Sequence, residues 1–401
     1  MNSLFAAVEL APRDPIFGLN EQFNADTRPN KVNLGVGVYC DDQGRIPLLE
    51  SVRRAEIARV EAAAARGYLP MDGIAAYNKG AQTLLLGNGS PIIASGRAVT
   101  MQALGGTGAL KIGADFLKHL LPQAKAVISD PTWANHRALF EGAGFAVDTY
   151  PYYDAATHGL NFDAMLASLQ GLPARTVVVL HACCHNPTGV DPTLDQWRQI
   201  AQVVKQRELV PFLDIAYQGF GDGIEQDASV VRLFADLDVT MLVSSSFSKS
   251  FSLYGERVGA LTVIAASRDE GARVLSQIKR VIRANYSNPP THGGMLVSGV
   301  LNSPELRALW ESELAGMRDR IRDMRGQLVE KLRENGVALN FDFVRAQRGM
   351  FSYSGLTGAQ VERLRVDHGV YAVGSGRICV AALNTGNIDY VAQSIAKVLT
   401  A

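Results

Sequence analysis

One lysine stands out because of its surroundings. Lys249 lies in the stretch SSSFSKSFSLYGERVG, residues 244–259, among small hydroxyl residues and eight positions before Arg257. The apolar run TMLV, residues 240–243, comes just before this stretch, and the apolar run GALTVIAA, residues 259–266, comes just after it. Lysine is rarely buried without a partner. We therefore expect Lys249, at the carboxyl end of a core strand, either to cap a group or to react with one.

Two further strand ends carry polar groups. Asp214 follows the apolar residues of VPFLDIAYQGFG, and Asn186 begins the sharp NPTG turn of HACCHNPTGVD. Taken alone, Asp214 is more often a turn cap than a catalytic acid, and NPTG is usually only a turn. Parallel strands, however, bring their carboxyl ends to one edge of a sheet. Together the three segments predict that an acid, an amide and a lysine meet there.

A glycine turn supplies a fourth candidate. LGGTGALKIGADFL opens directly into a helix, and the backbone N–H groups at such a start, with Thr107 beside them, suit a phosphate. GGTGAL lacks the G-x-G-x-x-G spacing of a dinucleotide site. The metal-like HACCH, residues 181–185, is interpreted as structural, because adjacent strand residues point to opposite faces and are poorly placed to share one ion. No metal site is expected.

Jointly, these groups match the needs of one cofactor, pyridoxal phosphate. It requires a lysine for a Schiff base, an acid that keeps the ring nitrogen protonated, and donors for its phenolic oxygen and its phosphate. Lys249 and Asp214 meet the first two needs, because an ionised carboxylate stabilises the pyridinium charge. Asn186 and Tyr217 suit the phenolic oxygen. The expected phosphate ligands are Gly106, Thr107, Ser246 and Arg257, whose forked guanidinium suits an anion.

Five motifs carry a family resemblance. SFSKSFSLYGERVG, DIAYQGFG, HNPTG, GGTGAL and SGRICVAALN resemble the class I, fold-type I aminotransferases of the aspartate and aromatic kind, in the family's order and spacing. The resemblance runs from about Asp14 to the C-terminus. It implies that Lys249 is the Schiff-base lysine and that Asp214 is the partner of the ring nitrogen. It also implies that Trp133 of DPTWANH stacks on the ring, with His136 supporting the acid.

The resemblance also implies which residues bind substrate. Arg377 begins the apolar strand of GSGRICVAAL, where a buried guanidinium needs an anionic partner. By itself such an arginine is more often half of a structural salt bridge, but the family match makes it the clamp for the α-carboxylate. Gly37 of NLGVGVY, Trp133 and Asn186 are expected to line the same pocket. Arg283 of IRANYSNPP matches an arginine that reaches a dicarboxylate's distal group from the other subunit.

A homodimer with shared active sites follows from this resemblance. Tyr68 of GYLPMDG is expected to reach the neighbouring subunit's phosphate. Once substrate displaces Lys249, the freed amine is the expected general base for the Cα proton. The predicted reaction is a ping-pong transamination of amino acids with 2-oxo acids, in which glutamate and 2-oxoglutarate form one substrate pair.

A separate set of motifs indicates which amino acid is preferred. YLPMDG, SDPTWANHRALFEGAGF, TYPYYDAAT, LPAR and QRGMFSYSGL are more similar to the tyrosine and phenylalanine enzymes, and Cys40 stands where aspartate specialists often have a basic residue. We expect an aromatic aminotransferase that also accepts aspartate, in which a neutral ring displaces Arg283 or stacks beneath it. The alternative is a strict aspartate enzyme. A sensory regulator domain lacks support from any DNA-binding pattern, and the glycine spacing argues against a nicotinamide dehydrogenase.

These groups require a sheet to position them. Between residues 98 and 266, short apolar runs with little polar alternation alternate with helical patterns, which is typical of parallel strands covered on both faces. The sequence therefore predicts an α/β domain that binds ligands beyond the carboxyl ends of its strands. The resemblance implies fold type I, with a mostly parallel seven-stranded sheet in a large domain plus a smaller α/β domain.

A long helical pattern over residues 303–335 joins the two predicted domains. Apolar residues recur there every three to five positions. The large domain is expected to span 46–305, and the small domain is discontinuous, comprising 1–45 and 306–401. The charged run AGMRDRIRDMRGQ, residues 315–327, is interpreted as a solvated helix face.

Composition excludes other classes of function. The 401 residues include 39 basic and 39 acidic ones, a balance that gives no reason to expect nucleic acid or an anionic membrane as partner. No apolar window is long enough for a membrane span, and the start lacks the pattern of a secretion signal. Four cysteines do not make a disulfide framework, so a reducing, cytoplasmic setting is expected.

Overall fold

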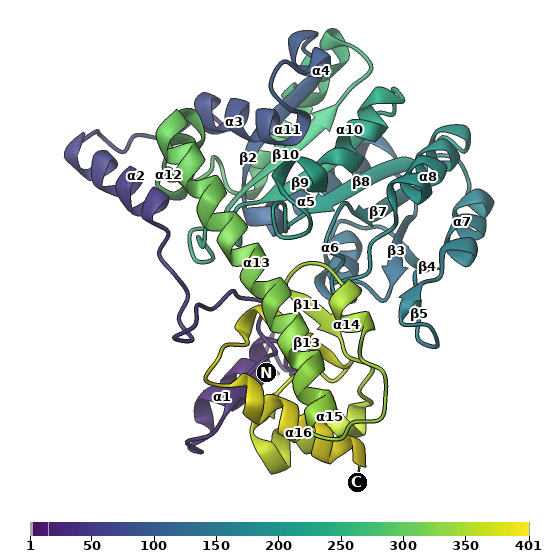
Figure 1. Cartoon of the computed structure of the whole chain (residues 1–401). Helices are drawn as coiled ribbons and strands as arrows, with labels where there is room; N and C mark the ends of the chain where they lie inside the picture. The colour runs from purple at the N-terminus through teal and green to yellow at the C-terminus, as the bar shows by residue number, and fades with distance from the viewer. Residues whose placement is uncertain (1–2, 15, 401) are drawn as a thin grey trace.

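The computed structural model describes residues 3–14 and 16–400 and is organised around one large sheet (Figure 1). Seven strands lie in the order β2-β10-β9-β8-β7-β3-β4, which confirms the predicted sheet. All neighbours are parallel except β10, which is antiparallel to both β2 and β9. The strands are β2 (Ala98–Leu104), β3 (Ala126–Asp130), β4 (Val147–Pro151), β7 (Val177–His181), β8 (Val210–Ile215), β9 (Met241–Ser246) and β10 (Val258–Ile264).

Helices cover both faces of this sheet. Val177 and Val179 of β7 share a core cluster with α5, α6 and α11, whereas Val178 and Leu180 belong to the cluster that includes α7, α8 and α10. Because alternate strand residues point to opposite faces, both sets must be apolar. The helices of this part are α2 (Glu50–Glu61), α3 (Ala75–Leu86), α4 (Pro91–Ala94), α5 (Gly105–Leu120), α6 (Asn135–Gly142), α7 (Phe162–Gly171), α8 (Leu194–Gln206), α9 (Ile224–Asp227), α10 (Ser229–Asp236), α11 (Arg268–Asn285) and α12 (His292–Asn302).

The edge strand β4 lacks the continuous apolar run that predicts a buried strand. Only Tyr150 is buried among its five residues, and Asp148 and Thr149 are exposed. An edge strand is not covered on both faces, so its apolar pattern is weak. A short hairpin, β5 (Tyr153–Asp154) with β6 (Gly159–Leu160), follows it.

The long helix α13 (Pro304–Glu334) runs from the level of α12 down to α16 (Figure 1). The hydroxyl of Ser303 caps its start by accepting a hydrogen bond from the N–H of Leu306 at 3.3 Å. Around its lower end lie α1 (Phe17–Ala25), β1 (Val32–Asn33), α14 (Phe343–Ala346), β11 (Phe351–Tyr353), α15 (Gly358–His368), β12 (Val370–Tyr371), β13 (Arg377–Cys379), a 3₁₀ turn (Val380–Ala382) and α16 (Ile388–Thr400). Parallel pairing of β1 with β12 brings the N-terminal segment to this region.

The interpretation of residues 315–327 as a solvated face is wrong for one charged residue. Arg325 is only 2% exposed and lies on the buried face of α13 with Ile321 and Leu328. Its place one helical turn from these apolar residues puts it on their side of the helix. None of the helices in the described part of the chain is both long and apolar enough to cross a membrane.

Candidate active site

Three neighbouring strand ends bring the predicted acid, amide and lysine together. β7, β8 and β9 are adjacent and parallel, with His181 opposite Asp214 and Asp214 opposite Ser244. Asn186 follows β7, and Lys249 follows β9, so both leave the sheet at the edge where Asp214 ends its apolar run. The topology thus accounts for the convergence that the sequence predicts.

Lys249 is partly buried beside an aromatic ring. Its Nζ lies 4.9 Å from the centroid of the Tyr217 ring. Burial lowers the pKa of Lys249 to about 8; the carboxylate of Asp214 opposes this shift, and the guanidinium groups of Arg257 and Arg377 reinforce it. A substantial share of this amine is therefore neutral near physiological pH and able to accept a proton.

Asp214 is a buried carboxylate that remains ionised. Burial alone would raise the pKa of Asp214, but the hydrogen bond from His136, whose Nε2 lies 3.1 Å from Oδ2, and the positive charge of Lys249 bring it below its usual value. The Nδ1 of His136 pairs with the Thr132 hydroxyl at 2.8 Å, which fixes the ring. Trp133 packs edge-to-face on the same imidazole with ring centroids 5.3 Å apart.

Arg377, near the C-terminal end of the chain, is buried against the N-terminal segment and the turn that carries Asn186. It donates to the Asn186 side-chain oxygen at 3.2 Å and to the Gly35 carbonyl at 2.6 Å. Its buried Nε has no hydrogen-bond partner among residues 3–14 and 16–400. Burial lowers the pKa of Arg377. A cation with a free donor and no carboxylate at hand is suited to binding an anion.

Phe351 lies against this guanidinium, and Gly37 lies against Phe351. The Phe351 ring centroid lies 4.2 Å from the Arg377 guanidinium carbon, a cation–π contact, and 5.8 Å from the Tyr217 ring centroid. A Cβ atom on Gly37 would lie 2.7 Å from Cζ of Phe351. Gly37 therefore has to be glycine for the ring to keep this position. Tyr217 and Asn186 are also in contact, with the amide nitrogen 3.5 Å from the phenol oxygen.

Gly105, Gly106 and the guanidinium of Arg257 lie together at the start of α5, and we call this group the α5 cradle. Gly105 has a φ of +68°, and a Cβ atom on it would lie 2.5 Å from Nη2 of Arg257. Ser246 packs on Gly106, whose added Cβ would lie 3.2 Å from that of the serine. Within the described residues no side chain caps the N-terminus of α5, where the partly buried Thr107 lies. Free N–H groups at a helix start beside an arginine suit a phosphate.

Two predicted residues lie apart from this cluster. Tyr68 is 95% exposed, and Arg283 is exposed on α11, where it donates a hydrogen bond to Ser287. The described chain provides no hydrogen bond from either residue to Lys249 or to Arg377. Both side chains point to solvent in the single subunit.

Sequence reasoning missed two buried residues near Arg377, namely Phe351, which contacts its guanidinium, and Arg325, which donates to the Phe351 carbonyl. Phe351 lies in QRGMFSYSGL, a stretch noted only for its family resemblance, and one aromatic residue in a short strand carries no functional signal. Arg325 was hidden in a run of alternating charges. Its position on the apolar face of α13 was the available signal, because a charge at such a position requires a reason.

The protein is similar to known aminotransferases over nearly its whole length. Residues 29–395 match the family model described as aminotransferase class I and II. The chain is 67% identical over 397 residues to an aspartate aminotransferase of Pseudomonas aeruginosa, covering 99% of this chain and all of that one. It is 51% identical over 398 residues to an aromatic-amino-acid aminotransferase of Escherichia coli, with 99% and 100% coverage.

A solved structure agrees with these relatives. The aromatic-amino-acid aminotransferase of Burkholderia pseudomallei, covalently bound to pyridoxal phosphate, superposes with a TM-score of 0.97 at 70% identity, covering 99% of this chain and all of that one. Relatives of both specificities thus match at high identity. A family model that covers most of the chain and relatives matched end to end lead to one conclusion: this chain belongs to the class I and II aminotransferase family.

Proposed function

We propose that the protein transaminates aromatic amino acids, tyrosine and phenylalanine, and also aspartate, with 2-oxoglutarate. As a family member it is an aminotransferase that uses pyridoxal phosphate. The single observation that carries the assignment of residues is the meeting of Lys249, Asp214 and the α5 cradle at one edge of the sheet.

The residues present fit this cofactor. The α5 cradle, which includes Arg257, would hold the phosphate together with Thr107 and Ser246. A Cβ atom on Gly105 would fill this space. Asp214 would face the ring nitrogen, Trp133 the ring, and Asn186 and Tyr217 the phenolic oxygen. Pyridoxal phosphate, when bound, supplies the electron-withdrawing ring that stabilises negative charge at the substrate's Cα.

The chain's own groups would then bind the substrate and move its proton. Arg377 binds the α-carboxylate through its fork, and Asn186 orients that fork by accepting a hydrogen bond from it. Lys249, with its pKa lowered to about 8, takes the proton from Cα. His136 keeps Asp214 ionised throughout by donating to its carboxylate. The alternation of an amino acid and an oxo acid at one site gives ping-pong kinetics.

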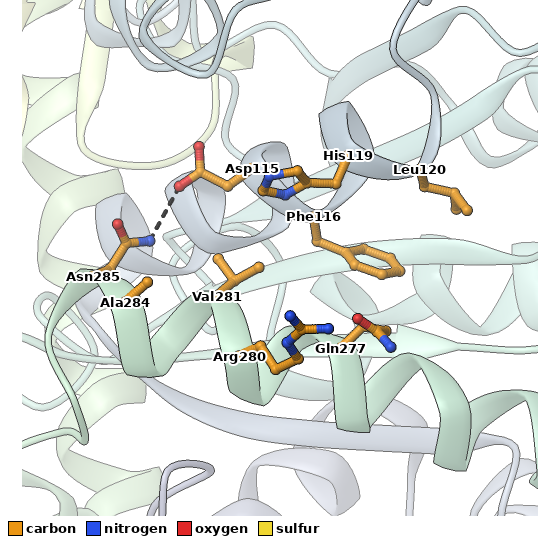
Figure 2. Close-up of a pocket in the computed structure, with 9 residues that line it drawn as sticks. All are labelled: Asp115, Phe116, His119, Leu120, Gln277, Arg280, Val281, Ala284 and Asn285. Atoms are coloured by element: carbon orange, nitrogen blue, oxygen red, sulfur yellow. Dashed lines mark hydrogen bonds between the residues drawn. The ribbon is translucent and has the colours of Figure 1, made fainter.

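A second subunit would complete the site. Tyr68 and Arg283 are exposed here, as groups that act in a neighbouring subunit must be. The N-terminal segment also exposes apolar side chains suited to a partner surface, namely Leu4, Phe5, Val8 and Leu10. A cavity of about 540 Å³ lies between α5 and α11 (Figure 2). Phe116 and Val281 line it, as does Ala284, which directly follows Arg283 in the chain. A homodimer that covers these surfaces is the proposed assembly.

The proposed substrate preference depends on position 40. Cys40 is half-buried and uncharged, and its main-chain carbonyl is held by Arg320 at 2.9 Å. The absence of a side-chain charge at this position favours a ring over a second carboxylate. The alternative is an aspartate aminotransferase with strict dicarboxylate preference. We also propose a cytoplasmic setting, in keeping with four cysteines that are free thiols.

Two experiments test these assignments. Borohydride reduction of the holoenzyme followed by digestion should place the cofactor label on the peptide that contains Lys249; a label on any other lysine contradicts the assignment. Separately, kcat/KM is compared for tyrosine, phenylalanine and aspartate with 2-oxoglutarate. An aromatic preference is wrong if tyrosine and phenylalanine react thousands of times less efficiently than aspartate.

A further inference from the structure

Arg325 is a buried cation without a carboxylate partner. Its Nη1 donates to the carbonyl of Val344 at 3.0 Å, and its Nη2 donates to the carbonyls of Gly349 at 2.8 Å and Phe351 at 2.5 Å. No carboxylate of the described residues lies within salt-bridge distance of it. Burial lowers the pKa of Arg325 to about 10. A guanidinium buried in this way is costly, so its retention calls for a role beyond filling space.

The loop that Arg325 holds packs directly on the turn that carries Asn186. Gly349 has a φ of +76°, and a Cβ atom on it would lie 2.5 Å from Cβ of Cys184. On the other side, a Cβ atom on Gly189 would lie 2.8 Å from the Phe351 carbonyl oxygen. The backbone of Gly349 thus lies directly on the short side chain of Cys184, and the backbone of Gly189 lies directly on the Phe351 carbonyl, so the loop has little room to shift at this junction.

The ring at the end of this loop is part of the carboxylate pocket. Phe351 follows Gly349 by two residues, and in the β11–β13 pair it lies opposite Cys379, the last residue of the strand that begins at Arg377. Its ring lies against the Arg377 guanidinium and leaves Gly37 no room for a side chain. The orientation of the Arg377 fork therefore depends on where the Phe351 backbone is fixed.

We propose that Arg325 is a positioning residue for the substrate's carboxylate. By holding the carbonyl groups of Gly349 and Phe351, it fixes the Phe351 ring against Arg377 and so sets the direction of the binding fork. This inference rests on the proposed function, in which Arg377 binds the carboxylate. It links the long helix α13 to the pocket through two hydrogen bonds and one aromatic ring.

Binding of maleate to the holoenzyme, measured by isothermal titration calorimetry, tests this role without turnover. R325K keeps the charge but loses the fork, R325M loses both, and F351L removes the ring while leaving the arginine contacts in place. Each should raise the Kd roughly tenfold, the effect expected for a well-desolvated cation–π contact. R333K, at an exposed arginine of the same helix that pairs with Asp342, should leave the Kd within about twofold of the wild type.

A double variant separates positioning from general stability. If Arg325 acts through the ring, R325K/F351L should bind maleate about as weakly as either single variant, because contacting residues are not additive. A Kd unchanged in R325K or in F351L, or a double effect equal to the product of the two, overturns the proposal. Failure of R325K to fold would assign Arg325 to stability and overturn it too.

A parallel titration of R377K distinguishes this inference from the proposed function beneath it. If R377K binds maleate as the wild type does, the proposed role of Arg377 itself fails. If R377K loses binding while R325K and F351L retain it, only the positioning role of Arg325 fails.

Discussion

The candidate site has two regions that differ in how they are held. In the first region, Asp214 at the edge of the large sheet and Arg377 in β13 are buried and hydrogen-bonded, and each side chain has a fixed position within one subunit. The second region consists of Tyr68 and Arg283, which are exposed and, within the described chain, have no hydrogen bond to Asp214 or Arg377. One region is preorganised by the fold, and the other would acquire its geometry only on a partner.

This difference separates chemistry from recognition. Preorganised charges act on developing charge without reorganising, so losses at the buried edge should slow the reaction itself. Of the exposed groups, Arg283 would add a binding contact to the substrate's distal carboxylate, so its loss should act on selected substrates only. The predictions below test that division, from the largest expected effect to the smallest.

Replacement of Lys249 by alanine should have the largest effect. With no amine to take the Cα proton, single-turnover transamination should slow by roughly 10⁴-fold or more, because a positioned base and its covalent role are lost together. Rapid mixing of the holoenzyme with excess tyrosine measures the rate. Lys205→Ala, on the exposed end of α8, serves as control and should keep the wild-type rate. A variant at position 249 that retains more than a tenth of the rate contradicts this role.

Asp214→Asn should cost less, about 10²- to 10³-fold in kcat, the range seen when one preorganised electrostatic group is removed. Asparagine nearly preserves the shape, so the melting temperature should change little while the rate falls.

Removal of the imidazole by His136→Leu should act in the same direction as Asp214→Asn but more weakly, because the pKa of Asp214 then rises as burial is no longer opposed by the hydrogen bond. A His136 variant slower than the Asp214 variant would contradict this order.

The sequence predicted the residues at the edge of the large sheet better than it predicted the residues that surround Arg377. Lys249, Asp214 and Asn186 each follow an apolar strand, so strand order alone brings them together. The contact of Phe351 with Arg377 depends instead on how two short strands and α13 pack, and nothing in the local sequence encodes that packing. Arg325 shows the limit most clearly, because its spacing from Ile321 and Leu328 is the one sign that it is buried and the charged residues around it hide that sign.

Arg283→Ala tests the exposed region. Loss of the distal contact should lower kcat/KM for aspartate by about 10²-fold, whereas kcat/KM for phenylalanine should change less than about threefold, because a charge pair is worth more than a contact with a neutral ring. Equal losses for both substrates would contradict a role in dicarboxylate recognition. Arg273→Ala, at an exposed position on the same helix, is the matched control.

Mixed dimers sharpen this prediction. The Lys249→Ala and Arg283→Ala variants are mixed after unfolding and refolded together. If each arginine acts in the other subunit, about a quarter of all sites should then contain both intact groups, because half of the dimers are mixed and each has one complete site. Activity toward aspartate should return to that fraction. Recovery that does not exceed the residual activity of the Arg283→Ala protein would place the arginine in its own subunit.

The smallest effect expected is a dependence of stability on pH that only the buried edge should show. Burial lowers the pKa of His181 to about 3, so this imidazole stays neutral in the fold while the unfolded chain takes up a proton below about pH 6.5. Its contribution to stability is therefore present above pH 6.5 and is lost as the pH falls toward 3. At pH 5 this group alone should lower the free energy of unfolding by about 2 kcal/mol relative to pH 7.

Urea unfolding of the holoenzyme at both pH values should show that the free energy of unfolding of His181→Gln falls correspondingly less than that of the wild type. His119→Gln, at an exposed histidine of α5, should lose as much as the wild type does. Equal losses in all three proteins would mean that the buried imidazole does not titrate on unfolding.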